Sequence, residues 1–346
     1  MKIVNSFIHK HRIWRIDKFA LFFVYGLSLT LVISACSSNN TSNSVATQAA
    51  NQSATNQDVV IRIGYQKAAT ILNTMRVQKD LEKAFTANGA SVTWAEFPSG
   101  PPMLEAMNAG SIDFGYTGES PPIFAQAAGN PLVYVAYDPW GSKAEAILVP
   151  KSSSIKTLAD LKGKRIGVAK GSNTNYLLVK VLEKGRVDYK DIKPAFLQPP
   201  DARAAFEGNN IDAWAIWDPY LSAAQAATGA RTLTDATGLA PNRGYYLAAK
   251  SFVDKYPDAL KTVLDEVKKR NNWAKNNPTE VAKFLSPQLG IDVGVLEVAE
   301  KRRDYGVLPL TEEVIRKQQE IADTFYKIKL IPKSINVSEI VWKGNQ

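Results

Sequence analysis

The stretch RIGYQKAAT, residues 62–70, occurs a second time in the chain as RIGVAKGSN, residues 165–173. A second block, FPSGPPMLEAMNAGSID at residues 97–113, returns in the same order as FLQPPDARAAFEGNNID at residues 196–212. A single match of this kind occurs easily by chance. Two blocks in the same order and at nearly the same spacing indicate one structural unit that is present twice. We therefore predict two similar lobes.

Short runs rich in β-branched and aromatic residues alternate with helical stretches along the chain. In the first half the expected strands are residues 59–66, 91–97, 112–118 and 132–138, and the expected helices are residues 73–88, 101–108 and 122–128. The pattern starts again after EAILVPK, residues 145–151. Such alternation predicts an α/β fold in which a parallel sheet carries helices on both faces.

Loops that are rich in small, hydroxylic and amide residues follow the expected strands: GYQKAAT, FPSGPP, YTGESPP, AKGSNTN and IWDPY. Because the carboxyl ends of the strands in two facing open sheets border one crevice, we expect these loops to meet in a cleft. Ser99, Ser120 and Ser172 suit the cap positions of the helices that follow, and the prolines after the first two suit a helix's first turn. Helix starts of this kind direct N–H groups at one place, which favours an anion.

Taken singly, each of these loops is better explained as an ordinary helix cap, and it is the expected convergence of five of them that favours a binding site. Trp217 with Asp218 has a similar alternative, in which the indole belongs to the core and the carboxylate caps the next helix. Glu119 puts a carboxylate beside the expected anion, and the repulsion between the two negative charges would weaken binding. We expect Glu119 either to accept hydrogen bonds from its own loop or to face a polar group at the far end of the ligand.

Residues 1–57 have the composition of a targeting segment followed by a linker. Basic residues precede the uncharged apolar run Phe19–Ile33 and the sequence ISAC, which ends at Cys36, the only cysteine. This order resembles a secretory signal, residues 1–35, followed by a lipobox whose cysteine is acylated; the alternative is a short membrane anchor with an incidental cysteine. Residues 36–57 carry no charge and are mainly Ser, Thr, Asn and Gln, which predicts a disordered tether.

The composition of the remaining body excludes several kinds of chemistry. Both histidines, His9 and His11, lie in the expected signal, so that the body from Asp58 onward has neither histidine nor cysteine. Catalytic triads with histidine, Cys–His pairs and zinc sites of the usual ligands are therefore excluded, while carboxylate-pair and lysine chemistry stay open. The chain has a formal net charge of +9, of which +5 remains without the signal. The basic residues are spread singly, which favours small anions over nucleic acid.

At these loops the sequence closely resembles the aliphatic sulfonate-binding proteins of bacterial ABC importers, a family that includes taurine and nitrate receptors. The matching stretches are IGYQK, EFPSGPPMLEAMNAGSIDFGYTGESPPIFAQAAGNPLVYVA, EAILVPKSSSIKTLADLKGKRIGVAKGSN, DARAAFEGNNIDAWAIWDPY and YGVLPL. The resemblance covers nearly all of residues 58–310 and implies a bilobal periplasmic-binding-protein type II fold. Its two doubly wound lobes, residues 58–140 with 242–346 and residues 141–241, would be joined by two crossing segments.

The resemblance also implies a function without catalysis, metal or cofactor. A monomer, anchored by lipid at Cys36 on the periplasmic or extracytoplasmic face of the membrane, would capture an organosulfonate and deliver it to a permease with its ATPase. Carried over loop by loop, the ligand-binding residues are Gln66, Ser99, Gly100, Thr117, Gly118, Glu119, Gly171, Ser172, Asn173, Thr174, Trp217, Asp218, Asn242 and Tyr245. Asn175 and Arg243 depart from the family's usual residues and bear on which sulfonate tail is accepted.

Other functions stay open at this point. Taurine is a zwitterion and would give Glu119 a partner, a pyrimidine precursor of thiamine would stack on Trp217, and nitrate would need a tighter site than these loops suggest. An enzyme on the same fold would use Glu119 and Asp218 as acid and base. Residues 312–330 predict an amphipathic helix that packs on the first lobe.

Overall fold

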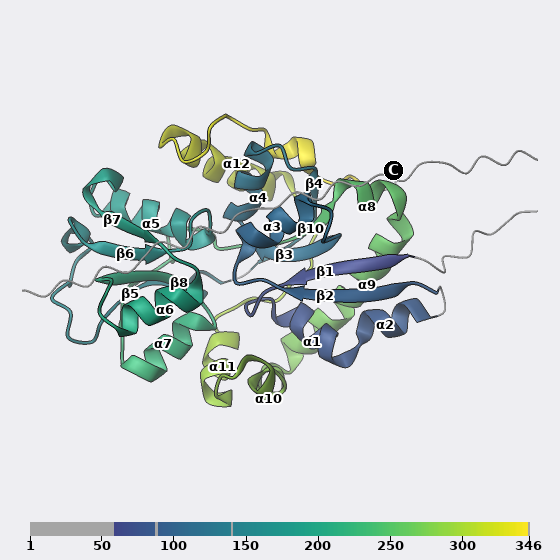
Figure 1. Cartoon of the computed structure of the whole chain (residues 1–346), viewed down its shortest axis with the longest axis horizontal. Coiled ribbons are helices and arrows are strands. Elements are labelled where there is room, and N and C mark those ends of the chain that lie inside the picture. Colours follow the sequence, from purple (N-terminus) through teal and green to yellow (C-terminus); the bar gives the residue numbers. More distant parts are fainter. Residues whose placement is uncertain (1–58, 87–88, 140, 345–346) are drawn as a thin grey trace, which may run out of the picture. The chain divides into compact units, whose positions relative to one another are not determined.

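The computed structural model describes residues 59–86, 89–139 and 141–344, which form two five-stranded sheets (Figure 1). The predicted signal, the tether and Cys36 lie outside the described residues. The first sheet has the order β2 (Ser91–Glu96), β1 (Val60–Tyr65), β3 (Phe114–Gly118), β10 (Gly244–Ala249) and β4 (Leu132–Asp138). The second has the order β7 (Lys193–Phe196), β6 (Arg165–Val168), β8 (Ala213–Trp217), β5 (Glu145–Val149) and β9 (Arg231–Asp235). We call each sheet with the helices packed on it a lobe.

The two sheets have the same design, which confirms the prediction of two similar lobes. Strands β1 to β4 correspond in spatial order to β6 to β9, and β10 and β5 fill the same fourth position. Each of these two strands is reached by a crossing from the other lobe. The structural repeat therefore covers β1 to β4 and β6 to β9, while β5 and β10 lie outside it.

The fourth strand of each sheet is an exception to the predicted parallel arrangement. Strand β10 is antiparallel to β3 and β4, and β5 is antiparallel to β8 and β9. The register gives the reason, because Gly244 at the start of β10 pairs with Gly118 at the end of β3, and Glu145 pairs with Trp217 in the same way. A chain that arrives from the other lobe enters at the carboxyl edge of the parallel strands and has to run back against them.

The helices agree with the predicted pattern except in one place. The predicted helix over residues 73–88 is two helices, α1 (Thr70–Gln78) and α2 (Asp80–Phe85). Lys79 separates them in the left-handed region, at φ 56°, where its N–H donates to the carbonyls at the end of α1. The other helices are α3 (Gly100–Asn108), α4 (Ser120–Ala127), α5 (Asn173–Lys184), α6 (Pro199–Glu207), α7 (Tyr220–Thr228), α8 (Lys250–Lys255), α9 (Pro257–Asn276), α10 (Pro278–Leu289), α11 (Val293–Glu300) and α12 (Glu312–Lys327).

The charged residues that make the repeat visible have a structural role in each lobe. Arg62 lies near the start of β1, and its Nη2 lies 2.6 Å from Asp113 Oδ1, just before β3. The backbone N–H of Arg165 donates to Asp212 Oδ2 at 2.7 Å, just before β8. Both pairs join neighbouring parallel strands at their amino ends, which is the edge away from the crossings. The repeated Arg and Asp therefore hold the strands and take no part in the cleft.

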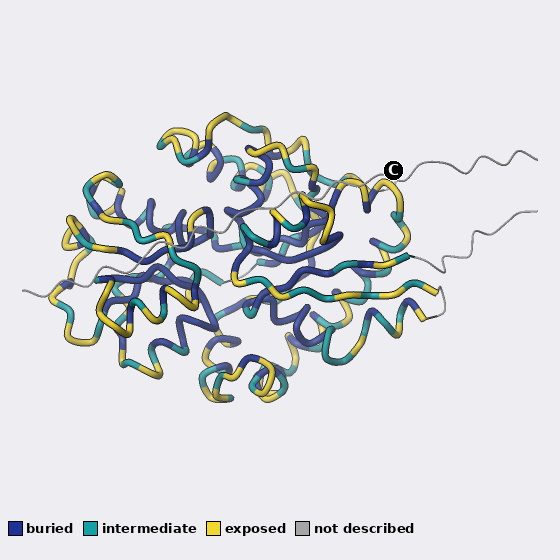
Figure 2. The backbone as a smooth tube through the Cα atoms, viewed as in Figure 1, coloured by how far each residue is buried: buried dark blue, intermediate teal, exposed yellow. Residues whose placement is uncertain are grey.

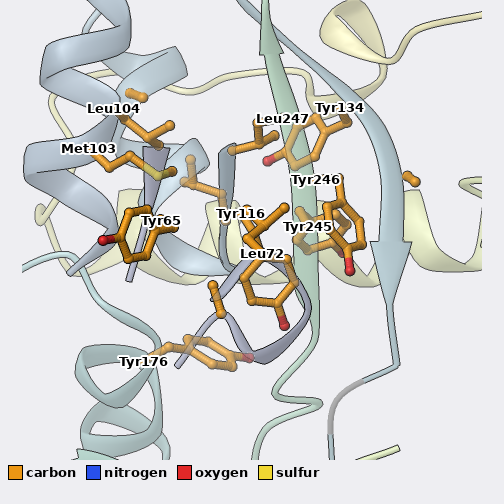
Figure 3. Close-up of a cluster of buried hydrophobic side chains, with 14 of the residues drawn as sticks. Tyr65, Leu72, Met103, Leu104, Tyr116, Tyr134, Tyr176, Tyr245, Tyr246 and Leu247 are labelled. Carbon is orange, nitrogen blue, oxygen red and sulfur yellow. The ribbon is translucent and has the colours of Figure 1, made fainter. Parts of the chain in front are cut away.

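The core lies on both faces of each sheet (Figure 2). Helix α3 packs so closely on β1 that a Cβ on Gly64 would lie 2.8 Å from Met103 Cγ. Around β10 the core is aromatic, as Figure 3 shows: the rings of Tyr134 and Tyr245 meet edge to face with centroids 5.0 Å apart. Such ring pairs stabilise by about 0.5–1.5 kcal/mol beyond their buried area. Among the described residues, none of the helices combines the length and apolar character that crossing a membrane requires.

Candidate functional site

A small pocket, with a cavity volume of about 20 Å³, lies where the carboxyl ends of the two sheets meet. The residues that line it are Gln66, Ala68, Gly100, Tyr116, Thr117, Gly118, Pro121, Ser172, Asn173 and Trp217. They come from the ends of β1, β3 and β8 and from the starts of α3, α4 and α5. The loops that the sequence placed at one cleft therefore do converge.

Half of the predicted ligand-binding residues line this pocket. They are Gln66, Gly100, Thr117, Gly118, Ser172, Asn173 and Trp217. Three lining residues were not predicted, namely Ala68, Tyr116 and Pro121. All three belong to the loops GYQKAAT and YTGESPP, which had been singled out for the cleft, although none of the three was predicted to bind the ligand. The apolar residues form the other part of the wall.

The starts of α3 and α5 leave their backbone donors without side-chain caps. Ser99 and Ser172 occupy the cap positions as predicted, but neither hydroxyl caps its helix. Ser99 Oγ donates to Gln198 Oε1 at 2.7 Å, and Ser172 Oγ lies 3.0 Å from Thr174 Oγ1. The prediction of hydroxyl caps is wrong because these side chains find tertiary or local partners. In α3 the first turn offers the N–H of Gly100, because Pro101 and Pro102 have none. In α5 the first-turn N–H groups remain for a ligand, with about half a positive charge at the helix start.

The third predicted cap, Ser120, is the first residue of α4 and not its cap, a position that Glu119 occupies. The side chain of Asn173, from the other lobe, binds the start of α4: its Oδ1 accepts a hydrogen bond from Ser120 N at 3.2 Å. Its Nδ2 donates to Asn242 Oδ1 at 3.0 Å. A Cβ on Gly118 would overlap this Asn173 side chain, so that the close approach of the lobes needs a glycine here.

The contact between Ser99 and Gln198 also joins the lobes, and the internal repeat explains it. In the second block Gln198 stands at the position that Ser99 has in the first. The two lobes face each other with equivalent edges, so equivalent residues meet across the cleft. This contact was missed by sequence reasoning, although the alignment of the two blocks contained the signal for it.

The predicted hydrogen bonds from Glu119's own loop are not found among the described residues, because its donors lie on the second crossing segment. The side chain is buried, and its oxygens accept from the backbone N–H groups of Asn242 at 3.2 Å and Arg243 at 3.0 Å. Burial raises the pKa of Glu119 to about 7, although these hydrogen bonds and the charge of Arg243 lower it. Glu119 does not line the pocket. It holds the second crossing segment instead.

Asp218 lies behind the pocket wall and is occupied by protein partners. Its Oδ1 accepts from Ser222 N at 2.9 Å and from Ser222 Oγ at 2.6 Å, and its Oδ2 accepts from Arg302 Nη1 at 3.3 Å. The capping alternative for Asp218 therefore describes its contacts. With Glu119 and Asp218 both outside the lining, no carboxylate of the described residues borders the pocket.

The remaining predicted residues surround the pocket without lining it. Gly171 is in the left-handed region at φ 72°, and its N–H donates to Asn175 Oδ1 at 3.0 Å. Asn242 Nδ2 donates to Gly141 O at 2.9 Å, which joins the two crossing segments. Tyr245 lies in the aromatic core (Figure 3). Within the described part of the chain, no group of three or more His, Cys, Asp or Glu residues could hold a metal ion.

Two lobes of this topology, with a small pocket between the ends of their sheets, define a binding protein of the periplasmic-binding-protein fold. The model of the NMT1/THI5-like family matches residues 85–281, and the chain belongs to this family. It is 41% identical over 287 residues to a protein of Escherichia coli strain K12 described as an aliphatic sulfonates-binding protein, which covers 83% of this chain and 89% of the relative.

Solved structures give the same relationship. The alkanesulfonate-binding protein SsuA from Xanthomonas axonopodis pv. citri, bound to MOPS, is 40% identical with a TM-score of 0.78, over 83% of this chain and 99% of that one. The periplasmic aliphatic sulphonate binding protein SsuA from Escherichia coli is 41% identical with a TM-score of 0.75, over 83% and 93%. These close homologues are binding proteins and not enzymes. The resemblance read from the sequence is confirmed.

The buried glutamates near the crossings predict a dependence of stability on pH. Glu145, at the start of β5, has no hydrogen bond to either carboxylate oxygen within the described residues, and burial together with the charge of Glu119 holds its pKa well above the ordinary range. The folded-state pKa of Glu119, about 7, lies above its ordinary value of 4.5. The folded protein therefore binds more protons than the unfolded chain between these values, and stability falls as pH rises through this window.

Glu119→Gln is expected to remove up to about 3 kcal/mol of this fall between pH 4.5 and pH 7. Urea unfolding at half-unit steps of pH measures it, with the exposed Glu339→Gln as the matched control. A Glu119→Gln curve that runs parallel to the wild-type curve would contradict the assignment.

Proposed function

We propose that this chain is the substrate-binding lipoprotein of an ABC importer, which captures an aliphatic sulfonate between its lobes and passes it unaltered to a membrane permease. The observation that carries the proposal is the composition of the pocket. Its wall contains hydroxyl and amide groups and the uncapped starts of α3 and α5, and no carboxylate among the described residues. Such a wall suits an anion that never loses its charge.

The polar end of the pocket supplies what a sulfonate needs. A buried ion without partners costs many kcal/mol, and a sulfonate has three oxygens to satisfy. Thr117, Ser172 and Asn173 line this end together with the helix starts. Charge-assisted hydrogen bonds contribute about 1.5–3 kcal/mol each, so three or four support a Kd near micromolar, about −8 kcal/mol, after the costs of ordering. We assign the larger share to the loop of residues 171–174.

The apolar part of the wall favours an alkyl tail. Ala68, Tyr116, Pro121 and Trp217 line it, and an apolar surface of this kind rewards buried methylene groups by about 0.8 kcal/mol each. The related SsuA structure holds MOPS, whose charged end is an alkanesulfonate. Taurine is less well suited, because its ammonium group finds no carboxylate here, and nitrate has no apolar part. The other predicted residues, among them Ser99, Asp218 and Asn242, would support the loops from behind.

The crossing segments supply the motion that capture and release require. We place the hinge at residues 137–143 and 240–244, between residues 58–140 with 242–346 on one side and residues 141–241 on the other. Closure of such lobes over a ligand is a hinge motion. Acylation of Cys36 would keep this monomer at the extracytoplasmic face of the membrane, where it would present the closed lobes to the permease.

Calorimetric titration with ethanesulfonate, butanesulfonate and octanesulfonate tests the proposal. Taurine, sulfate, nitrate and the thiamine pyrimidine serve as competitors. We expect micromolar binding of at least one alkanesulfonate, at least tenfold weaker binding of taurine and sulfate, and recovery of the ligand unchanged by mass spectrometry. Tighter binding of taurine, or a modified ligand, would overturn it.

A further inference from the structure

Two adjacent arginines that directly follow α11 bond to different lobes. Arg303 Nη2 donates to Asp138 Oδ2 at 3.0 Å, at the end of β4 in the first lobe. Arg302 Nη1 donates to Asp218 Oδ2 at 3.3 Å, just after β8 in the second lobe. Two consecutive arginines therefore bind one acidic residue in each lobe.

The contact of Arg302 with the second lobe is more than one ion pair. Its guanidinium also donates to Ser222 Oγ at 3.2 Å and to Gln225 Oε1 at 3.1 Å, both on α7. The Asp218 side chain is only 4% exposed and that of Arg302 is 25% exposed. The Arg302 guanidinium makes one charge-assisted hydrogen bond to a buried carboxylate and forks to two further acceptors on α7. We expect this set of contacts to be stronger than the exposed ion pairs on the helix surfaces.

Both acids adjoin aromatic walls of the pocket. Asp218 directly follows Trp217, and Asp138 accepts a hydrogen bond from Tyr116 Oη at 3.0 Å. Tyr116 and Trp217 line the pocket from opposite lobes. Each arginine therefore bonds an acid that adjoins one side of the binding pocket.

The segment that begins with these arginines, residues 302–308, runs alongside the first crossing. We call this segment the strap. Tyr137 and Leu308 exchange two backbone hydrogen bonds of 2.9 Å. A Cβ on Gly141 would overlap the carbonyl oxygen of Arg302, and one on Gly306 would lie 2.6 Å from Pro139 Cδ. Figure 1 shows α11 next to α7, on the side of the second lobe. The strap is therefore a third connection between the lobes, made by packing and not by a crossing of the chain.

We propose that Arg302 is a positioning residue that holds the second lobe against the strap and sets how long a bound ligand is retained. Its interlobe role stands on the contacts above, and only the ligand readout rests on the proposed function. Arg302→Gln removes the charge and the fork while leaving a polar side chain. Because the contact closes the lobes without touching the ligand, its loss is expected to act on dissociation more than on association.

The test combines two measurements on the full chain. Stopped-flow displacement of butanesulfonate gives the dissociation rate, which we expect to rise at least tenfold in Arg302→Gln with little change in the association rate. Electron-spin distance measurement between labels at the exposed positions Lys83→Cys and Lys184→Cys, in a Cys36→Ser background, gives the separation of the lobes without ligand. We expect a longer and broader distribution in Arg302→Gln. Arg302→Lys, which keeps the charge but not the fork, is expected to recover part of both effects.

Arg316→Gln is the matched control, because it removes an exposed ion pair with Glu320 on α12. Rates and distances in Arg302→Gln that equal those of this control overturn the proposal. Absence of any sulfonate binding in the wild type, combined with an altered lobe separation in Arg302→Gln, would defeat the proposed function and support the role of Arg302. Normal sulfonate binding in the wild type, with lobe separation and dissociation rate unaltered in Arg302→Gln, would support the proposed function and defeat the role of Arg302.

Discussion

Ser172→Asp is expected to weaken alkanesulfonate binding by a hundredfold or more. Ser172 lies at the cap position of α5, lines the pocket and is buried. A carboxylate there would face the sulfonate at close range, and two like charges about 4 Å apart repel by about 4 kcal/mol at an effective dielectric constant of 20, which corresponds to nearly a thousandfold. It would also accept the N–H groups of the first turn, which are the donors assigned to the ligand.

Calorimetry with butanesulfonate measures this effect, and two variants serve as controls. Ser172→Ala keeps the N–H groups free and should cost less than tenfold. Thr311→Asp adds the same charge at the cap of α12, an exposed position whose side chain already accepts from Val314 N, and should leave binding unaltered. Full affinity in a folded Ser172→Asp protein would remove α5 from the binding site.

Arg303→Met should lower the free energy of unfolding by about 3–5 kcal/mol at pH 7, the usual cost of breaking a buried ion pair from one side. The Arg303 side chain is 4% exposed and that of Asp138 is 0% exposed. Arg303 Nη1 also donates to Thr70 Oγ1 at 2.6 Å. Without the guanidinium, the Asp138 carboxylate would be left in the core with Tyr116 as its side-chain donor.

Urea unfolding at several pH values distinguishes this explanation from simple loss of packing. Burial raises the pKa of Asp138 to about 6, although Arg303 and Tyr116 lower it. A protonated carboxyl loses little when Arg303 is replaced, so the destabilisation should be smaller at pH 5 than at pH 8. The double variant with Asp138→Asn should regain most of the loss. A loss that is equal at both pH values and in the double variant would contradict the role of the pair.

Much of the architecture could be predicted from the residues alone. The repeat from Arg62 and from Arg165 predicted two like lobes, because a unit that folds in one way does so again when its pattern of buried and exposed residues returns. Gly100, Thr117, Ser172 and Asn173 were placed at one cleft because the carboxyl ends of parallel strands share an edge. These are local patterns and a general rule of topology, and both can be read along the chain.

What the chain alone did not reveal was the partner of each polar group. Glu119 accepts a hydrogen bond from the backbone of Arg243, and Asn173 accepts one from the first N–H of α4. Arg302 bonds to the second lobe and Arg303 to the first. In each pair the residues lie between 53 and 165 positions apart. Such contacts exist only after the chain has crossed to the second lobe and returned, and they decide which donors remain free. The residues therefore predicted where a ligand would meet the protein, and the folded arrangement decided which groups are left to bind it.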